Sequence, residues 1–268
     1  MQMTTFGRFI AALGAVALVV TVTSCGHGDN TAATSTASSE ATAPAPTLPS
    51  AAPVTGPALP PFAPSPGVGA DCQYPPSPDP AAKPAPRPQT GQIATDPAQI
   101  GLTIVTNMGR IPVQLANNES PCTVNSFVSL AQGAFFDNTD CHRLTAYHGG
   151  LAVLQCGDPK GDGTGGPGYQ FADEYPADQF PPNDPALRQP VVYPRGTLAM
   201  ANSGPNTNGS QFFMLYRDSL LQPSYTVFGT ITPAGLAVLD KIAAAGVAGG
   251  ADDGAPATEV TINSARLD

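Results

Sequence analysis

Hydrophobic and polar positions in the second two-thirds of the chain follow the pattern of a mainly β domain. Short runs rich in β-branched and aromatic residues, bounded by glycine, proline or asparagine, are typical of strands. They lie at residues 101–106, 111–115, 140–144, 151–156, 196–200, 211–216, 225–231 and 259–262. Apolar residues three and four positions apart predict helices over residues 120–131 and 234–242. Many short strands with two helices predict a closed antiparallel barrel capped by helices.

The first predicted helix has clear start and stop signals. Ser120 is the predicted N-cap, and Pro121 takes the first helical position, where its missing N–H is tolerated. Gly133 follows the last apolar residue of the helical pattern and predicts its end.

A polar loop from Met200 to Phe213 lies between two predicted buried strands. Its Gly204-Pro205 and Asn208-Gly209 pairs are turn dipeptides. Asparagine and serine side chains hold such loops in shape by bonding to nearby backbone. A structured polar loop between core strands is a good position for a binding site. An ordinary long hairpin loop is the alternative.

The N-terminus has the pattern of a secretory signal. Arg8 precedes an apolar stretch from Phe9 to Val22, and small residues follow. The stretch is shorter than the roughly 20 apolar residues that a membrane span needs, and an uncleaved membrane anchor is the alternative. Its end, Val22-Thr23-Ser24-Cys25, resembles the lipobox of bacterial lipoproteins. That resemblance implies removal of residues 1–24, lipid attachment to Cys25, and anchoring at the extracytoplasmic face of the cell membrane, with secretion as the alternative.

Residues 25–92 are rich in alanine, proline, threonine and serine, and sixteen of the 31 prolines lie between residues 41 and 90. Such a segment buries too little apolar surface to offset its ordering entropy, and its prolines favour extended chain. It is predicted to be a disordered tether, with a ligand for proline-binding domains as the alternative. Residues 93–268 then remain for one domain.

Charge and cysteine content narrow the possible partners. The chain has 20 acidic and 11 basic residues and a net charge of −9. It has no basic patch, which argues against nucleic-acid binding. Nothing in the pattern indicates an obligate oligomer, and a monomer is expected. If Cys25 carries lipid, four cysteines remain, an even number that suggests disulfides in an exported protein. The absence of a C-x-x-C pair argues against a zinc site.

Five motifs occur in a fixed order along the predicted domain. They are Cys141-His142-Arg143, Gln155-Cys156-Gly157-Asp158, Gly163-Thr164-Gly165-Gly166, the stretch from Met200 to Phe213, and Val227-Phe228-Gly229. Together they resemble the cyclophilins, which are peptidyl-prolyl cis-trans isomerases. The resemblance covers residues 99–268 and is strongest to exported cyclophilins of actinobacteria. It implies an eight-stranded antiparallel barrel with two helices, a substrate groove on the outer wall, and no metal or other cofactor.

The resemblance also implies roles for single residues. Arg143 matches the catalytic arginine, which would stabilise the twisted X-Pro amide. Gln155 and Asn202 would hold the peptide backbone, and Phe213 would pack against the proline ring. The other implied substrate-binding residues are Ala152, Val153, Ala201, Gln211, Leu221 and Tyr225.

The sequence departs from the family in the proline pocket. The loop between Arg143 and Gln155 is about four residues longer than is usual in the family, which places the pocket phenylalanine and methionine at Ala152 and Val153. The pocket then has smaller walls unless Tyr147 or Leu151 folds in. Leu220 takes the position of the usual tryptophan, which implies weak binding of cyclosporin-type ligands at most.

Four cysteines allow three pairings. Cys141 and Cys156 lie on consecutive predicted strands near a shared hairpin, so we favour a disulfide between them. Cys72 and Cys122 would then form the second disulfide.

These observations predict an isomerase that accelerates the folding of exported proteins by acting on their proline-containing segments. A catalytically weak peptide-binding or chaperone module on the cell surface is the alternative, favoured by the small side chains at Ala152 and Val153.

Overall fold

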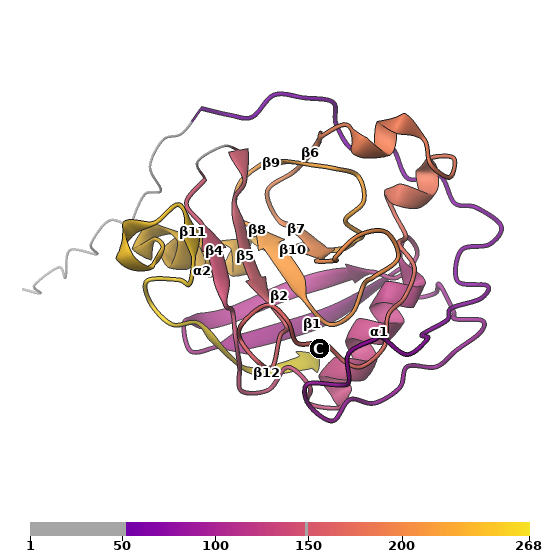
Figure 1. The fold of residues 1–268 in the computed structure, drawn as a ribbon, viewed down its shortest axis with the longest axis horizontal. Helices are drawn as coiled ribbons and strands as arrows, with labels where there is room; N and C mark the ends of the chain where they lie inside the picture. Colours follow the sequence, from indigo (N-terminus) through magenta and orange to yellow (C-terminus); the bar gives the residue numbers. More distant parts are fainter. Residues whose placement is uncertain (1–51, 148–149) are drawn as a thin grey trace, which may run out of the picture. The chain divides into compact units, whose positions relative to one another are not determined.

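The structure, a computed structural model, describes residues 52–147 and 150–268. The predicted signal segment, Cys25 and the first part of the predicted tether lie outside these residues. The described chain is mainly β (Figure 1). Its strands are β1 Gln99–Thr106, β2 Gly109–Ala116, β3 Thr139–Asp140, β4 Arg143–Thr145, β5 Val153–Cys156, β6 Val191–Tyr193, β7 Thr197–Met200, β8 Phe212–Leu215, β9 Ser219–Leu221, β10 Val227–Ile231, β11 Asp253–Gly254 and β12 Thr261–Leu267.

Ten of these strands form one antiparallel sheet in the order β11-β4-β5-β8-β7-β10-β2-β1-β12-β3. β3 and β4 lie near opposite ends of this order, yet only Cys141 and His142 separate them in the chain. The stretch 139–145 therefore joins both ends, and the sheet curls on itself. The predicted antiparallel class is confirmed. The strand count exceeds eight because residues 140–144 form parts of two strands, β11 adds an edge, and β6 and β9 pair separately.

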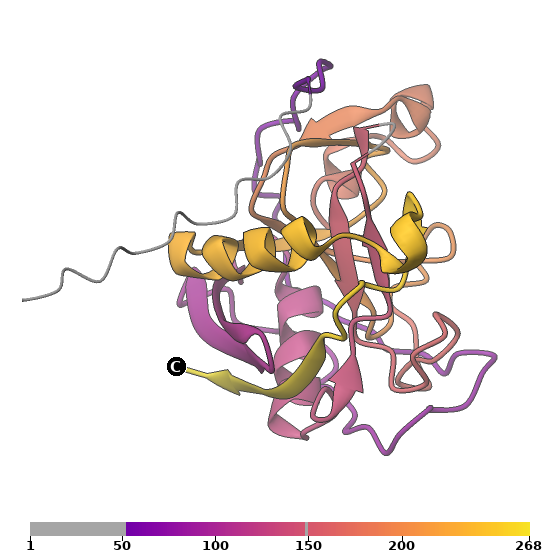
Figure 2. The same ribbon diagram turned by 90° about the vertical axis from the view of Figure 1, so that its left-hand side faces the viewer.

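Two α-helices cover the curled sheet, α1 at Pro121–Gln132 and α2 at Pro233–Ala245. Figures 1 and 2 show them on opposite sides of it. α2 packs against β2, and α1 packs against β12. No helix in residues 52–147 and 150–268 is long and apolar enough to cross a membrane.

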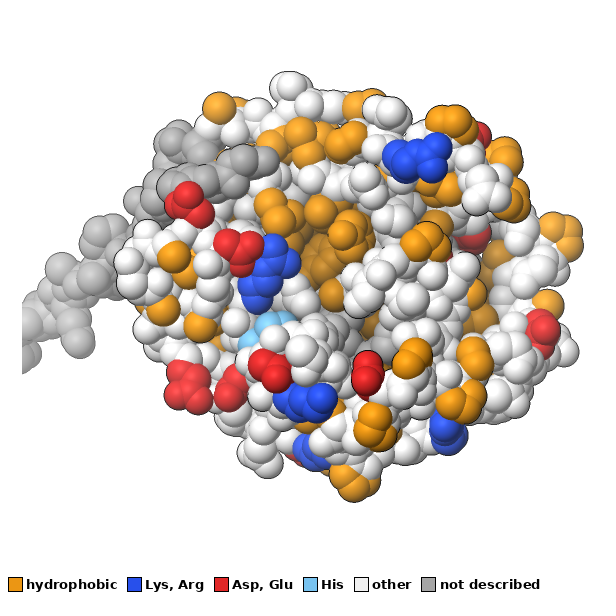
Figure 3. Space-filling model, viewed as in Figure 1, with side chains coloured by type: hydrophobic (Ala, Val, Ile, Leu, Met, Phe, Trp, Pro, Cys, Tyr) orange, Lys and Arg blue, Asp and Glu red, His pale blue; other side chains and the backbone are white. Residues whose placement is uncertain are grey.

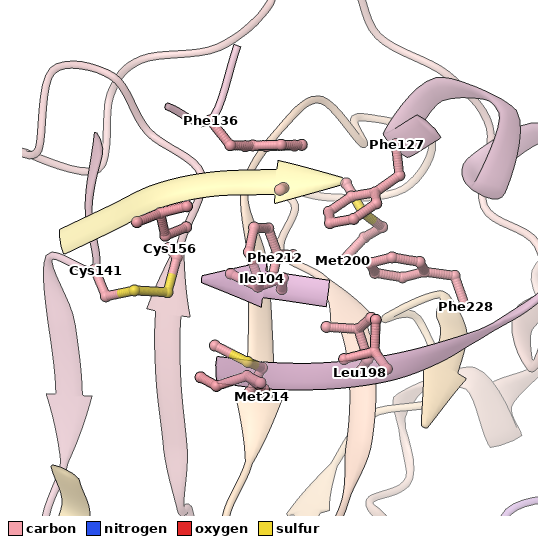
Figure 4. Close-up of a cluster of buried hydrophobic side chains, with 14 of the residues drawn as sticks. Ile104, Phe127, Phe136, Cys141, Cys156, Leu198, Met200, Phe212, Met214 and Phe228 are labelled. Carbon is pink, nitrogen blue, oxygen red and sulfur yellow. A yellow bond between two sulfur atoms is a disulfide. The ribbon is translucent and has the colours of Figure 1, made fainter. Parts of the chain in front are cut away.

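The interior of the curled sheet is filled by aromatic and aliphatic side chains. Phe127 of α1 lies 4.8 Å from the ring of Phe136, 5.2 Å from Phe212 and 5.0 Å from Phe228, measured between ring centroids. Figure 4 shows this cluster with the Cys141–Cys156 disulfide at its edge. Aromatic pairs of this kind stabilise a core beyond the area they bury.

The N-terminus of α1 is capped differently from the prediction. Ser120 does occupy the N-cap position, but its hydroxyl donates to the carbonyl of Val227 at 2.7 Å. The carboxylate of Glu174 takes over the capping role. It accepts from the backbone N–H groups of Cys122 and Thr123 at 3.0 and 2.7 Å, and from the Thr123 hydroxyl at 2.6 Å. Negative charge at this position is favoured by the helix dipole.

Residues 52–92 pack onto the domain, so the prediction of a disordered tether up to residue 92 is wrong for this part. The described residues 52–92 belong to the same compact unit as the rest of the domain. Cys72 is 1% exposed and forms a disulfide with Cys122 of α1, as favoured from sequence, and Tyr74 is 5% exposed. Figure 1 shows the segment running along the outside of the fold from β6 and β9 to α1. A few apolar side chains and one disulfide order a segment that is rich in proline and alanine and poor in large apolar residues.

The capping carboxylate predicts a pH-dependent stability. Burial outweighs its hydrogen bonds and raises the pKa of Glu174 to about 7. The folded state then holds this proton more tightly than the unfolded chain does. The contribution of Glu174 to the free energy of unfolding is therefore full below about pH 4.5, and it is lost as the pH rises through about 7. Urea denaturation should show the free energy of unfolding of Glu174→Gln falling less over this range than that of wild type. The exposed Glu259→Gln is the control, and equal slopes for all three proteins would contradict the assignment.

Candidate active site

A single row of side chains crosses four neighbouring strands of the sheet. Arg143 of β4 pairs with Gln155 of β5, Gln155 pairs with Phe213 of β8, and Phe213 pairs with Ala199 of β7. Directly opposed residues share one face of a sheet, and strands lie about 4.8 Å apart. The register therefore places the backbone of Arg143 about 10 Å from that of Phe213, two strand spacings away. Their side chains share the outer face, with the amide of Gln155 between them.

Arg143 is held by an acidic side chain that the sequence did not suggest. Its Nε and Nη2 donate to the two carboxylate oxygens of Asp253 at 2.8 and 2.7 Å. The hydrogen bonds that Arg143 donates to this carboxylate raise the pKa of Arg143, and the same bonds lower the pKa of Asp253. The Arg143 side chain keeps 38% of its surface exposed. The guanidinium is therefore charged, oriented and open to a ligand.

A chain of amide groups links Arg143 to the glycine-rich loop. Arg143 Nη1 donates to Gln155 Oε1 at 3.3 Å, and Gln155 Nε2 donates to Gln211 Oε1 at 2.8 Å. Gln211 Nε2 in turn donates to the carbonyls of Gly163 and Gly165 at 2.8 and 2.9 Å. Each bond fixes the next side chain, so Gln155 and Gln211 position the guanidinium and each other.

The apolar end of the row belongs to a second hydrophobic cluster on the outer face, which we call the outer cluster. Its buried members are Val153, Tyr175, Val191, Tyr193, Ala199, Phe213, Leu215 and Val227, and its partly exposed members are Leu59, Phe62, Leu151, Ala201, Leu221 and Tyr225. The rings of Phe213 and Tyr225 meet edge to face, with centroids 5.7 Å apart. Figure 3 shows hydrophobic side chains recessed at the centre of this face, beside a cationic group. Such a hollow can receive a small apolar ring.

Strand alternation corrects one predicted pocket residue. Val153 and Phe213 belong to the outer cluster, but Ala152 is 0% exposed and belongs to the interior core. The backbone N–H of Ala152 donates to Ser219 Oγ at 3.0 Å. Leu151 packs against the outer cluster instead, as one of the two candidates to enlarge the pocket wall. The other candidate, Tyr147, packs against the interior core.

The loop after Met200 is tied by its own side chains, as its composition predicts. Asn202 Oδ1 accepts from the backbone N–H of Gly204 at 3.2 Å, and Asn202 Nδ2 donates to the carbonyl of Ser224 at 2.8 Å. Ser203 N–H donates to Thr207 Oγ1 at 2.8 Å. These bonds fix the Asn202 amide within the loop, so its second Nδ2–H and its main-chain N–H and C=O are the groups available to a peptide backbone.

The favoured disulfide between Cys141 and Cys156 is present, with 4.0 Å between the two Cα atoms. It joins the strands next to Arg143 and Gln155 and braces them. His142 has no hydrogen bond to either ring nitrogen within residues 52–147 and 150–268. Burial lowers the pKa of His142, which keeps its ring neutral beside the Arg143 charge.

Sequence reasoning missed two parts of this site. Asp253 carried no signal because β11 pairs with β4 from more than 100 residues away. Leu59 and Phe62 are large apolar residues within a proline-rich segment. They were the available signal that this segment packs on the domain. Leu220 lies beneath the same segment, since a Cβ on Gly56 would be 2.8 Å from its Cδ2.

Comparison with known proteins defines the class. A family model described as cyclophilin type peptidyl-prolyl cis-trans isomerase matches residues 101–267. The chain therefore belongs to the cyclophilin type peptidyl-prolyl cis-trans isomerases.

Relatives in two mycobacteria match beyond that domain. A probable peptidyl-prolyl cis-trans isomerase B of Mycobacterium tuberculosis is 71% identical over 204 residues, which are 76% of this chain and 66% of that protein. The Mycobacterium leprae protein of the same description is 67% identical over 204 residues, which are 69% of its length. The matched part of this chain thus spans just under two thirds of the Mycobacterium tuberculosis protein and slightly more than two thirds of the Mycobacterium leprae protein.

Solved structures agree on the fold. A cyclophilin type peptidyl-prolyl cis-trans isomerase from Cryptosporidium parvum is similar with a TM-score of 0.51 and 29% sequence identity, covering 63% of this chain and 98% of its own. A second structure of that protein was determined in the presence of the dipeptide Ala-Pro, with a TM-score of 0.50.

The ion pair at Arg143 predicts a positioning effect. Asp253→Asn keeps the shape of the side chain but removes the charge that orients the guanidinium. We expect kcat/KM for an X-Pro peptide to fall about three- to tenfold, with a stability change of no more than about 1 kcal/mol because the pair is exposed. Asp240→Asn is the matched control, since Asp240 of α2 forms a similarly exposed ion pair with Arg195, outside the row. A faster Asp253→Asn enzyme would show that Asp253 restrains Arg143.

Proposed function

We propose that this protein catalyses the cis-trans isomerisation of X-Pro peptide bonds, with Arg143 as the catalytic residue. The observation that carries the proposal is the row on the outer face of the sheet. It sets a charged, oriented guanidinium at one end and an apolar hollow at the other, about two strand spacings away. Membership of the cyclophilin type peptidyl-prolyl cis-trans isomerases supports the same reaction.

The chemistry requires a donor that acts mainly on the transition state. Amide resonance makes the barrier about 18–20 kcal/mol. Twisting the bond breaks the resonance and leaves a lone pair on a pyramidal proline nitrogen. A donor aimed at that nitrogen stabilises the twisted state and hardly affects the planar one. Arg143 has five N–H donors and uses three on Asp253 and Gln155, which leaves two for the substrate.

The remaining residues hold the peptide while the bond turns. Phe213, Leu221 and Tyr225 would enclose the proline ring, with Val153 and Leu151 completing the wall. The main chain of Asn202 and the free amide N–H of Gln155 would bind the peptide backbone. The Cryptosporidium parvum protein studied in the presence of Ala-Pro supports a proline dipeptide as the minimal ligand.

The covalent structure supports a site of action outside the cytoplasm. Two disulfides are typical of proteins outside the cytoplasm. With a signal segment and lipid on Cys25, the domain would stand at the extracytoplasmic face of the cell membrane, where exported chains fold. Its substrates would be the proline-containing segments of those chains.

An isomerase assay tests the mechanism directly. In a protease-coupled assay on an X-Pro peptide, wild type should accelerate isomerisation. Arg143→Ala should lose about 100-fold or more of kcat/KM, the loss expected when one transition-state donor is removed. Arg143→Lys, which keeps the charge but not the planar fork, should fall between the two.

Peptide binding separates the alternative function. Titration of a proline peptide followed by NMR should give similar affinities for wild type and Arg143→Ala. If Arg143→Ala is as fast as wild type, the assigned mechanism is wrong. If both proteins bind the peptide and neither accelerates isomerisation, the protein is a peptide-binding module.

Lipid attachment is tested in the exporting cell. Cys25→Ala should lose the incorporation of labelled fatty acid and move to the aqueous phase of a detergent extract, because each buried CH₂ of an acyl chain contributes about 0.8 kcal/mol. Ser24→Ala is the control and should keep both properties, since alanine is common before the lipidated cysteine. Unchanged partitioning of Cys25→Ala would reject the anchor.

A further inference from the structure

A second pocket of about 390 Å³ lies next to the catalytic row. Gln155, Ala201, Asn202 and Gln211 line it, so it is continuous with the proposed proline site. The glycine-rich loop at residues 163–167 forms another part of its lining. A peptide bound across the row would therefore place a neighbouring side chain in this pocket.

The outer wall of this pocket comes from the N-terminal segment. Ser77, Asp79 and Pro80 line it. The segment runs beside the glycine-rich loop, because Ser77 N–H donates to the carbonyl of Gly168 at 3.2 Å and Ala82 N–H donates to that of Gly166 at 2.9 Å. In the other direction, Gln170 N–H donates to the carbonyl of Pro75 at 2.9 Å. The wall is thus an irregular segment that backbone hydrogen bonds hold against residues 166–170.

Anchors on both sides of residues 77–80 fix the wall. Cys72 is bonded to Cys122 of α1, and the Tyr74 hydroxyl donates to the carbonyl of Cys122 at 2.7 Å. On the other side, Lys83 Nζ donates to the carbonyls of Ala134 and Asp137 at 3.1 and 2.7 Å. A wall held in this way can select a ligand, because its residues lose little conformational entropy when the ligand binds.

Two carboxylates lie at the pocket. Asp79 is the only acidic or basic residue in its lining, which otherwise consists of small residues, prolines, Tyr169, hydroxyls, amides and backbone. Asp158 lies behind the lining residue Gly165, where an added Cβ would be 1.9 Å from Asp158 Oδ1. Asp79 is exposed, with only its carbonyl accepting from Ser77 Oγ at 2.6 Å. Lys160 lies at the loop with Nζ 3.4 Å from Thr164 Oγ1, and Asp162 is next to the same threonine. The opposite charges of Lys160 and Asp162 offset each other.

We propose that this pocket binds a lysine or arginine side chain of the substrate, with Asp79 as the residue that selects it. The inference rests on the proposed isomerase function and adds a substrate class to it. A long apolar stem suits the small groups of the lining, and its charged end reaches the exposed carboxylate. The residue lies within three positions of the proline, because the two sites share lining residues and an extended chain spans at most about 3.6 Å per residue.

A peptide series measured by NMR exchange tests the preference without a coupling protease. Peptides with one X-Pro bond carry lysine, leucine or glutamate at each of three positions on either side of the proline. At one position, wild type should show kcat/KM for lysine about two- to fivefold above that for glutamate, the range that an exposed ion pair supports. The preference should decline in 1 M salt.

Variants of the wall decide the assignment. Asp79→Asn should lose the lysine preference and Asp79→Lys should reverse it, whereas Asp71→Asn, an exposed carboxylate of the same segment outside the pocket, should retain it. Absence of a preference in wild type, or its survival in Asp79→Asn, would overturn the proposal. If no peptide is isomerised, the proposed function fails. In that case the dissociation constants of the lysine and glutamate peptides, measured in the same samples, test the binding preference of the pocket. Equal dissociation constants would overturn the assignment of Asp79.

Discussion

The backbone pairing of β4, β5, β8 and β7 is the constraint on which the rest of the structure depends. It aligns Arg143, Gln155 and Phe213 in one row on the outer face. A slip of one residue in β5 would turn Gln155 toward the core and Leu154 toward the groove. The Cys141–Cys156 disulfide joins β5 to the chain just before β4 and opposes such a slip. Both the charged and the apolar part of the site thus follow from one register.

Burial on both faces explains why the N-terminal segment belongs to the domain. Every residue of β7 and β8 is buried, so the outer face needs a cover as much as the inner one does. Tyr175 of a loop and Tyr193 of β6 supply part of it, and Leu59 and Phe62 supply more. Proline suits such a cover, because it favours extended chain and has no N–H to leave unsatisfied. A segment with the composition of a tether therefore completes the groove.

The sequence predicted those parts of the protein that depend on local patterns. Alternating and continuous apolar runs located the strands of the main sheet, and the loop after Met200 is held by bonds to the side chains of its own Asn202 and Thr207. What depended on distant contacts was missed or misplaced. Ala152 was assigned to the pocket by counting back from Gln155, but strand alternation turns it inward. The pairing of Asp253 with Arg143 and the wall at Asp79 arise only when segments far apart in the chain meet.

In the proposed mechanism, the exposure of Arg143 links binding to catalysis. At 38% exposure the guanidinium is partly screened by water. Its interaction with the proline nitrogen of a bound peptide stays weak until the rest of that peptide excludes the water. Asp253 and Gln155 have already fixed its direction, so covering it costs no reorganisation. The peptide must supply the cover, and residues beside the proline do so when they occupy the neighbouring pocket. Binding energy gained there then strengthens the one contact that is made in the transition state, so flanking residues should affect kcat as well as KM.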